Sequence, residues 1–111
     1  MATDTDVEVA RRIFGYLVVS DPQTGESMLK GINGGYVEIP KWSTDTTAVH
    51  QVIMHFQKQG LVCRINSDAR PDGVVWTAGF CRPADDDYEI TTAGSLAMAV
   101  CTAALHLVKK S

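Results

Sequence analysis

The sequence predicts an α+β protein in which a small antiparallel sheet of about four to five strands packs with three helices as a three-layer α/β/α sandwich. Three observations favour this class. Amphipathic segments with clear end signals lie at residues 6–14 and 44–59, and an alanine-rich apolar segment lies at the C-terminus. Short runs of alternating or β-branched residues lie between them. This order is typical of an antiparallel sheet covered by helices.

The composition predicts a single domain over residues 1–111. Its 45% hydrophobic and 21% charged residues are ordinary for a globular chain. A formal net charge of −3 argues against direct nucleic-acid binding, which normally requires a basic surface. Three cysteines without a C-x-x-C spacing, and no signal peptide, predict a cytoplasmic protein with reduced thiols. The apolar run 96–105 is too short to span a membrane, so no membrane association is expected.

The central helix has the clearest end signals. Ser43 is expected to be its N-cap, so that the helix begins at Thr44, with Asp45 in the favourable field of the first turn. Gly60 is expected to end the helix in a Schellman-type turn, with Leu61 folding back on the last turn. The apolar face expected for this helix comprises Ala48, Val49, Val52, Ile53 and Phe56.

The N-terminal helix is predicted over residues 6–14, with Thr5 and Glu8 forming a capping box and Gly15 ending it. Its expected apolar face comprises Val9, Ala10, Ile13 and Phe14. The C-terminal helix is predicted to begin at Thr91 or Thr92 and to be largely buried. Its expected polar stripe comprises Ser95, Thr102, His106 and Lys109.

Strands are predicted over residues 16–19, 27–32, 35–39, 61–66 and 74–80. Asn33-Gly34 is a strong hairpin signal, Pro40 should close the third strand, and residues 68–73 are expected to form a turn. The glycine-rich stretch 30–35 is interpreted as this hairpin turn, since it lacks the pattern of a phosphate-binding loop.

Thiol and metal chemistry find weak support in the sequence. Cys63 and Cys101 lie in apolar patterns, where thiols act as small hydrophobic groups. Only Cys81, at a strand end beside Arg82, is expected to lie in an electropositive and accessible setting. His50 and His55 would point about 140° apart on a helix, so they cannot share one ion. The acidic residues 85–89 are interpreted as a solvated loop. No metal, cofactor or catalytic residue is therefore predicted.

The best binding candidate is the segment that leads into the central helix. A helix N-terminus offers free N–H donors to an anion, the hydroxyls of Ser43 and Thr44 add to them, and Lys41 adds positive charge. Trp42 would supply a flat surface for stacking, although capping by Ser43 and burial of Trp42 explain the same residues without a ligand. The candidate residues, including three that would join if the strand ends meet this helix start, are Lys41, Trp42, Ser43, Thr44, Arg64, Trp76 and Arg82.

The order of these elements resembles the phage ABA-sandwich domain family. The resemblance rests on the segment from Ile39 to Asp45, which reads IP-x-aromatic-Ser-Thr-Asp before a helix, and on the aromatic-Gly-aromatic segment of Phe14, Gly15 and Tyr16. The chain has Trp42 where the family more often has tyrosine. The resemblance covers nearly the whole chain and implies a phage or prophage origin with a three-layer fold. It implies no functional residues.

The resemblance and the absence of a catalytic constellation together favour a non-enzymatic phage accessory protein that acts by binding in the host cytoplasm. It would counter host defence in one of two ways, by sequestering a nucleotide-type immune signal or by blocking a host defence protein such as a CRISPR effector. The alternatives are a thiol-dependent enzyme built around Cys81 and a phage structural or assembly protein. An exposed sheet edge would also permit a homodimer.

Overall fold

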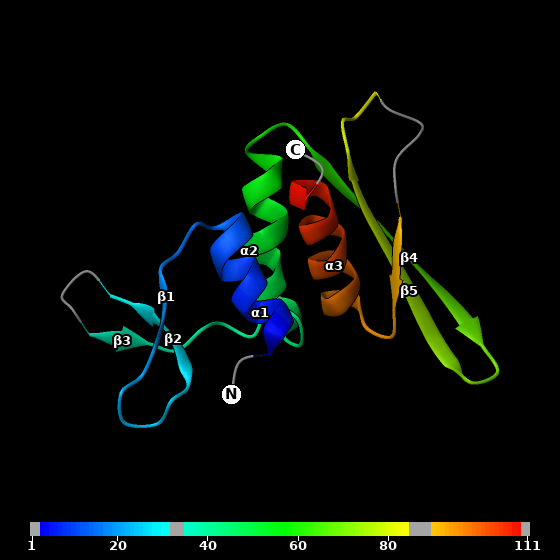
Figure 1. Ribbon diagram of the computed structural model, residues 1–111. Helices are drawn as coiled ribbons and strands as arrows, with labels where there is room; N and C mark the ends of the chain where they lie inside the picture. The colour runs from blue at the N-terminus through cyan, green and yellow to red at the C-terminus, as the bar shows by residue number, and fades with distance from the viewer. Residues whose placement is uncertain (1–2, 32–34, 85–89, 110–111) are drawn as a thin grey trace.

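The apolar C-terminal helix α3, Leu96–Lys109, is the element on which the other helices and one of the two sheets pack (Figure 1). The computed structural model describes residues 3–31, 35–84 and 90–109. Within them α3 contacts the other helices and all three strands of one sheet. Its small side chains let the backbones of its neighbours approach closely, which explains why an alanine-rich helix occupies the centre. Its buried residues are Ala97, Ala99, Val100, Cys101, Ala103 and Ala104.

The fold class α+β with three helices is confirmed, but the expectation of one sheet of four to five strands is wrong. Within residues 3–31, 35–84 and 90–109, six strands form two antiparallel sheets of three strands each, ordered β1-β2-β3 and β4-β5-β6. In Figure 1 the helices lie between these two sheets. The strands of the first sheet are only two to four residues long and end before the central helix, so the two sheets do not pair with each other.

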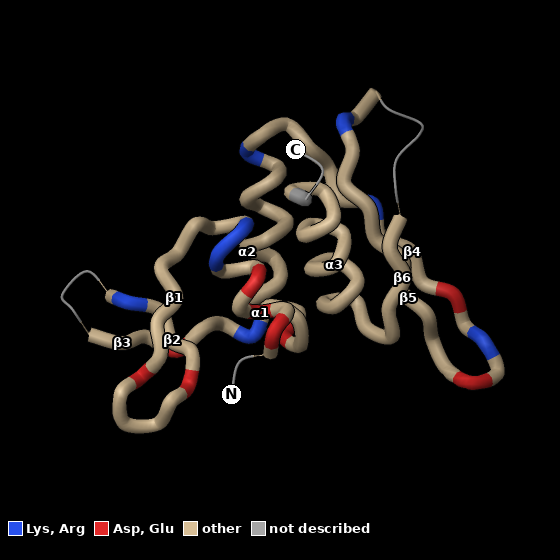
Figure 2. Tube along the Cα trace, in the orientation of Figure 1, with Lys and Arg blue, Asp and Glu red and all other residues tan. Residues whose placement is uncertain are grey.

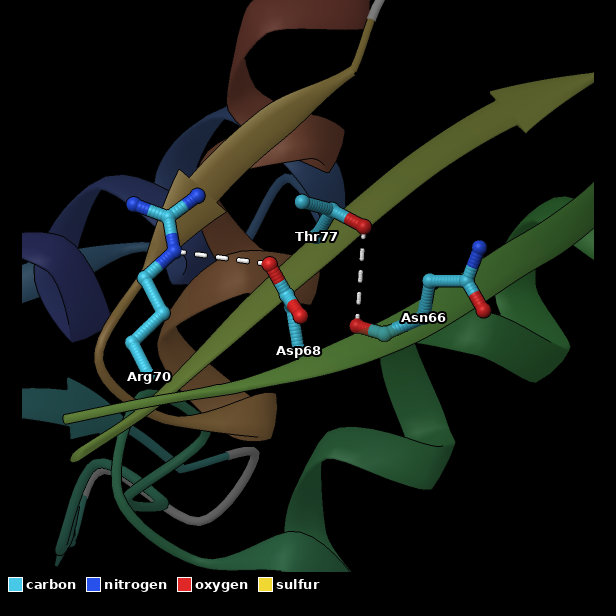
Figure 3. A network of polar contacts seen from close by, with 4 residues as sticks. All are labelled: Asn66, Asp68, Arg70 and Thr77. Atoms are coloured by element: carbon cyan, nitrogen blue, oxygen red, sulfur yellow. Dashed lines mark hydrogen bonds and ion pairs between the residues drawn. The ribbon is translucent and has the colours of Figure 1, made fainter.

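The second sheet consists of β4, Val62–Arg70, β5, Gly73–Cys81, and the short β6, Thr91–Ala93. The β4–β5 pairing is uninterrupted from Val62↔Cys81 to Arg70↔Gly73. Side chains on one face of this sheet join the hydrophobic core beneath α3, namely Cys63, Trp76, Ala78, Phe80 and Ala93. The opposite face is mainly polar, and Figure 3 shows Asn66, Asp68, Arg70 and Thr77 together on it.

The expected turn at residues 68–73 is present but shorter than predicted, because both strands continue almost to the tip. Only Pro71 and Asp72 remain between them, and Gly73 takes a positive φ of 138° that favours glycine. Figure 1 shows this hairpin extending past the helices. The radius of gyration of 15.2 Å accordingly exceeds the roughly 13 Å typical of a compact chain of about this length.

The expected helix start at Thr91 or Thr92 is also wrong. Both threonines are β-branched and pair with β5 as part of β6, where Thr91 faces Ala78. The helix begins at Leu96 because Ser95 caps it, its Oγ accepting from the N–H of Met98 at 3.2 Å.

The N-terminal helix begins earlier than the sequence predicts. It comprises α1, Asp4–Glu8, and a π-helical continuation η1, Val9–Ile13. Thr3 and Asp6, rather than Thr5 and Glu8, form the capping box. Gly15 ends the helix with φ of 68°, as expected. The predicted apolar face is confirmed, since Val9, Ala10 and Ile13 are buried and Phe14 packs against the core.

The first sheet comprises β1, Val18–Ser20, β2, Ser27–Lys30, and β3, Tyr36–Val37. The chain between the last two strands includes the predicted Asn33-Gly34 turn, which lies outside the described residues. The predicted strand at 35–39 is shorter than expected, because Ile39 leaves the sheet and is buried in the core.

The central helix α2, Thr46–Gln57, ends as predicted but begins two residues late. Gly60 has a φ of 87° and its N–H donates to the Gln57 carbonyl, while the N–H of Leu61 reaches back to the Phe56 carbonyl at 3.1 Å. These two bonds make the expected Schellman motif. The predicted apolar face is confirmed, with Val49, Val52 and Phe56 buried and Ala48 and Ile53 packed against the core.

Candidate functional site

Ser43 holds two helices together instead of capping α2. It is 1% exposed, and its backbone N–H donates to Oδ1 of Asp6 at 2.8 Å. The hydroxyl of Thr3 donates to Oδ2 of Asp6, so the Ser43 hydroxyl donates in turn to Thr3 Oγ1 at 3.1 Å. The cap of α1 is therefore built partly by the segment that precedes α2. The expectation that Ser43 is a helix N-cap is wrong because this tertiary contact takes both of its polar groups.

Asp45 is the true N-cap of α2. Its Oδ1 accepts from the N–H of Thr47 at 2.9 Å and from that of Ala48 at 3.4 Å. An anion at this helix start would meet N–H donors already bonded to a carboxylate, and it would be repelled by that charge. The N-terminus of α2 therefore lacks the open donors on which the predicted anion site depends.

Trp42 lies in the core, where its ring is 1% exposed. Its Nε1–H donates to Oε1 of Gln51 at 3.0 Å, which satisfies the one polar atom of the side chain. No face of this ring is open for stacking by a ligand. The sequence left open whether Trp42 is buried or available to a ligand, and the structure shows that it is buried.

Lys41 and Thr44 are both exposed at the surface. Lys41 lines a shallow hollow of about 330 Å³ together with Glu38, Pro40 and Asp45. The two carboxylates offset the charge of the lysine, so this hollow offers little net attraction for an anion.

Arg64, Trp76 and Arg82 do not meet the start of α2. Arg82 follows the end of β5, where Cys81 pairs with Val62 at the entry to β4. That entry lies beyond the C-terminal end of α2, and a helix of 12 residues is about 18 Å long. Trp76 packs against the core from β5, and Arg64 Nε donates to the sulfur of Cys81 at 3.2 Å. The seven predicted residues thus form no single site.

The structure instead brings three aromatic rings into a column that runs from the core to the surface. Phe14 stacks on buried Trp42 at a centroid distance of 5.1 Å, with 25° between the ring planes. Tyr16 also stacks on Phe14, at a centroid distance of 5.5 Å and with 12° between the ring planes. Tyr16 is 48% exposed, so the outermost ring of the column is partly accessible to solvent. The glycine turn at Gly15, where the Tyr16 N–H donates to the Ala10 carbonyl at 2.8 Å, places the last two rings.

The outer end of this column forms one wall of a hollow of about 370 Å³, which we call the aromatic hollow. The second wall is a face of α2 whose residues are spaced at i, i+3, i+4 and i+7, and therefore point the same way. Those residues are Gln51, Met54, His55 and Lys58; Phe14 and Tyr16 complete the lining.

The polar groups of the hollow are held in place by local contacts. Gln51 accepts from Trp42, as described above, and the Nε2 atom of His55 lies 3.1 Å from the side-chain nitrogen of Gln59. The His55 ring also contacts Phe14 edge to face at 5.2 Å. A half-open aromatic ring, an exposed thioether, an imidazole and a lysine on one surface can hold a planar ligand that carries a negative charge.

The three cysteines lie in apolar surroundings. Burial raises the pKa of the Cys63 thiol from 9.0 to about 11, with nearby Cys81 as the smaller cause. Burial also raises the pKa of Cys101 to about 12, with nearby Asp6 as the smaller cause. Cys81 is 4% exposed and accepts the hydrogen bond from Arg64. The sequence-based expectation that Cys81 is accessible is wrong, because its side chain is covered at the end of β5.

The raised thiol pKa values predict a pH dependence of stability. Because each folded pKa lies above the unfolded value, the protonated thiols contribute stability at pH below about 9, and this is lost as the pH rises through 11 and 12. The free energy of unfolding should fall as the pH rises from about 9 to about 12, and it should fall less steeply in the double variant Cys63→Ala/Cys101→Ala. Urea titrations of both proteins at matched pH values measure the difference. If the free energy of unfolding fell equally steeply with pH in both proteins, the two thiols would not be the cause of the pH dependence.

The described residues contain no group of three His, Cys, Asp or Glu side chains placed to hold a metal ion. Within the same residues, none of the helices combines the length and the apolar character of a membrane span.

Phe14 was predicted as part of the apolar face of the N-terminal helix and Tyr16 as the start of a strand, and neither was a binding candidate. Gln51, Met54, His55 and Lys58 were not binding candidates either. A signal was present, since the last four share a helical face that is distinct from the apolar stripe of α2. The aromatic residues opposite that face, Phe14 and Tyr16, flank a glycine turn more than thirty residues away in the chain. Their meeting with α2 was therefore not predictable from the sequence.

Comparison of the chain with protein-family models, with curated proteins and with solved structures gives no match.

Proposed function

We propose that the protein acts by binding rather than by catalysis, and that its site is the aromatic hollow. The ligand is a nucleotide-type molecule whose base stacks on Tyr16 and whose phosphate is held by Lys58. The observation that supports this most is the aromatic column, which ends in a half-exposed tyrosine ring beside the cationic end of α2.

The stacked rings favour a ligand with a flat face. Tyr16 already stacks on Phe14, which in turn stacks on buried Trp42, so the exposed ring loses little conformational freedom when a base stacks on it. Base stacking on an aromatic side chain contributes about 1–3 kcal/mol. A volume of about 370 Å³ is at the lower end of the range for ligand pockets, which suits one nucleoside unit.

The charge of the hollow favours an anionic tail on that ligand. Lys58 lines it, and the imidazole of His55 can donate a hydrogen bond in its protonated form or in one neutral tautomer. The C-terminal end of a helix disfavours an anion, so the lysine is the group on which phosphate binding depends.

The wider role that we propose is that of a phage or prophage accessory protein in the host cytoplasm, where it sequesters a nucleotide-type immune signal. The resemblance of residues 39–45 and of the Phe14-Gly15-Tyr16 segment to the phage ABA-sandwich family supports this origin. Location of the gene in a prophage region would support it.

Binding is tested by calorimetry with adenosine and guanosine monophosphates and with cyclic dinucleotides. We expect Tyr16→Ala to weaken binding of the responding nucleotide roughly 5- to 150-fold, the equivalent of one lost stacking contact. Lys58→Ala should weaken binding and flatten its dependence on salt. At a ligand concentration 100 times the Kd, the wild type should gain about 2.7 kcal/mol of stability.

Matched controls are available in the same chain. Tyr36, on β3, is exposed to the same extent as Tyr16, at 47% against 48%, so Tyr36→Ala should leave binding unchanged. Lys41→Ala removes an exposed lysine at the other end of the α2 region. If all of these nucleotides fail to bind, or if Tyr36→Ala weakens binding as much as Tyr16→Ala, the aromatic hollow is not the site.

The biological role is tested by infecting matched hosts, with and without single defence systems, with phage carrying or lacking this gene. An advantage confined to one defence system supports counter-defence, and its loss with Tyr16→Ala places that activity in the hollow. An advantage that persists with Tyr16→Ala, together with co-purification of a defence protein, favours the protein-blocking alternative. Equal loss of particle yield in all hosts favours an assembly role.

A further inference from the structure

The outer edge of β4 is the largest open backbone surface among the described residues. β4 is nine residues long and, among the strands that the structure describes, pairs only with β5, so every second residue presents its N–H and C=O to the other side. The other sheet edges, β1, β3 and β6, are only two to three residues long. Residues 64–70 of β4 are all exposed, which leaves this edge accessible.

Sheet edges normally carry features that prevent pairing with another chain, such as a bulge, a proline or a very short strand. β4 has none of these. Its sequence VCRINSDAR contains no proline, and its register with β5 runs without a bulge from Val62 to Arg70. Charged residues are present, but they carry both signs, as Figure 2 shows near the tip of the hairpin. Mixed charges attract a strand of the opposite pattern rather than excluding it.

We propose that two copies of the chain associate through their β4 edges, antiparallel and centred on Asn66, to form one six-stranded sheet. Asn66 is the midpoint of Val62–Arg70, so this register alone pairs all nine residues. It places Arg64 opposite Asp68 of the partner subunit, and Asp68 opposite Arg64 of the partner subunit. These side chains share the face shown in Figure 3, so the strand is self-complementary in charge.

The neighbouring registers are poorer. Centring on Ser67 would place Arg64 opposite Arg70 of the partner subunit, and centring on Asp68 would oppose two aspartates. Centring on Ile65 pairs only seven residues and places Arg64 opposite Asn66 of the partner subunit, without an ion pair. Like charges directly opposite each other destabilise a strand pair, so charge and length select the same register.

The ion pair between Asp68 and Arg70 is compatible with the pairing. Asp68 and Arg70 form an exposed ion pair at 3.4 Å with side chains 69% and 56% exposed, an interaction that is weak in water. The bond from Arg64 to Cys81 uses the Nε–H, which is one of the five N–H donors of the guanidinium.

Apolar exposure near the proposed axis supports the same partner. Ile65 is 38% exposed and Val74 is 47% exposed, although both lie on the sheet face that α3 covers nearer the base of the hairpin. A two-fold axis perpendicular to the sheet at Asn66 would bring the helices of both copies to this face. Ile65, next to that axis, would then lie against a second apolar layer instead of water.

Light scattering coupled to size exclusion tests the association directly. We expect twice the 12.0 kDa mass of one chain at concentrations up to about 0.5 mM, with dissociation on dilution. Asp68 is exposed, so Asp68→Arg should not disturb the fold of one chain. It should shift the mass toward the monomer, because it places an arginine opposite Arg64 of the partner subunit. The charge-swapped variant Arg64→Asp/Asp68→Arg should restore the dimer. A monomeric wild type at the highest concentration would overturn the proposal.

Cysteine cross-linking tests the register. Asn66→Cys should form an intermolecular disulfide on mild oxidation, because cross-strand Cβ atoms at the axis lie close enough for one. Ser67→Cys is the matched control and should not form a disulfide, since position 67 would lie opposite Ile65 of the partner subunit. Wild-type protein controls for Cys63, Cys81 and Cys101. A disulfide that forms with Ser67→Cys and not with Asn66→Cys would overturn the Asn66 register.

Discussion

Replacement of Asp6 with alanine is expected to lower the free energy of unfolding by about 3 kcal/mol, one of the two largest effects of any single change considered for this protein. Asp6 is 1% exposed and accepts three hydrogen bonds, two from Thr3 and one from the backbone of Ser43. Removing the carboxylate breaks the cap of α1 and leaves the Ser43 N–H without its acceptor in the interior. Urea-induced unfolding followed by circular dichroism measures the change.

Asp4 is the matched control, because it is an exposed carboxylate in the same first turn of α1. Asp4→Ala should cost only a few tenths of a kcal/mol, since it removes only a favourable charge at the helix start. Asp6→Asn should be intermediate, because the amide keeps one acceptor but turns an N–H group toward donors. Equal effects at positions 4 and 6 would show that Asp6 does not join α1 to the segment before α2.

Replacement of Trp42 with alanine is expected to cost about 4 kcal/mol, the other of these two largest effects. The ring is fully buried and packs between the core and Phe14, so its removal leaves a cavity that the surrounding helices cannot fill. Gln51, which accepts its hydrogen bond, is exposed and can bond to water instead. The loss is therefore mainly one of packing, and calorimetric unfolding measures it.

Trp42→Phe provides the informative comparison. A phenyl ring keeps the stack on Phe14 and fills much of the volume, so most of the stability should return. Nucleotide binding at the aromatic hollow should also survive, because Tyr16 and Lys58 are unchanged. A loss of binding in this variant at full stability would mean that Trp42 itself contacts the ligand, contrary to its burial.

Trp76→Ala tests the second tryptophan. This ring is only partly buried on β5, so its removal should cost less stability than the removal of Trp42. The same variant tests whether Trp76 has any part in nucleotide binding, for which the proposed site requires none.

The apolar periodicity of the sequence was sufficient to predict the helices and their buried faces. Val49, Val52 and Phe56 on α2, and Val9, Ala10 and Ile13 on the N-terminal helix, are buried as their spacing indicates. Periodicity is reliable here because burial of an apolar stripe is the main stabilising contribution, whatever the partner is. Gly15 and Gly60 were equally predictable, since positive φ is a local property that glycine tolerates.

Helix starts were predicted less well than helix ends. Thr3, Asp45 and Ser95 cap the three helices, whereas the sequence favoured Thr5, Ser43 and residues near Thr91. Several side chains near each start can accept from free N–H groups, so local chemistry does not select one. Contacts with distant residues decide which residue caps each helix, because Ser43 hydrogen-bonds to Asp6 and Thr91 pairs with β5.

The sequence by itself determined the number of helices, which of their faces are buried and where glycine ends them, because these depend on spacing and on local backbone freedom. Only the tertiary structure decided that the strands divide into two sheets, that Trp42 lies inside, and that Tyr16 and Lys58 line one hollow. The physical reason is that a site of this kind joins residues far apart in the chain, and their meeting depends on how the helices pack rather than on any local preference.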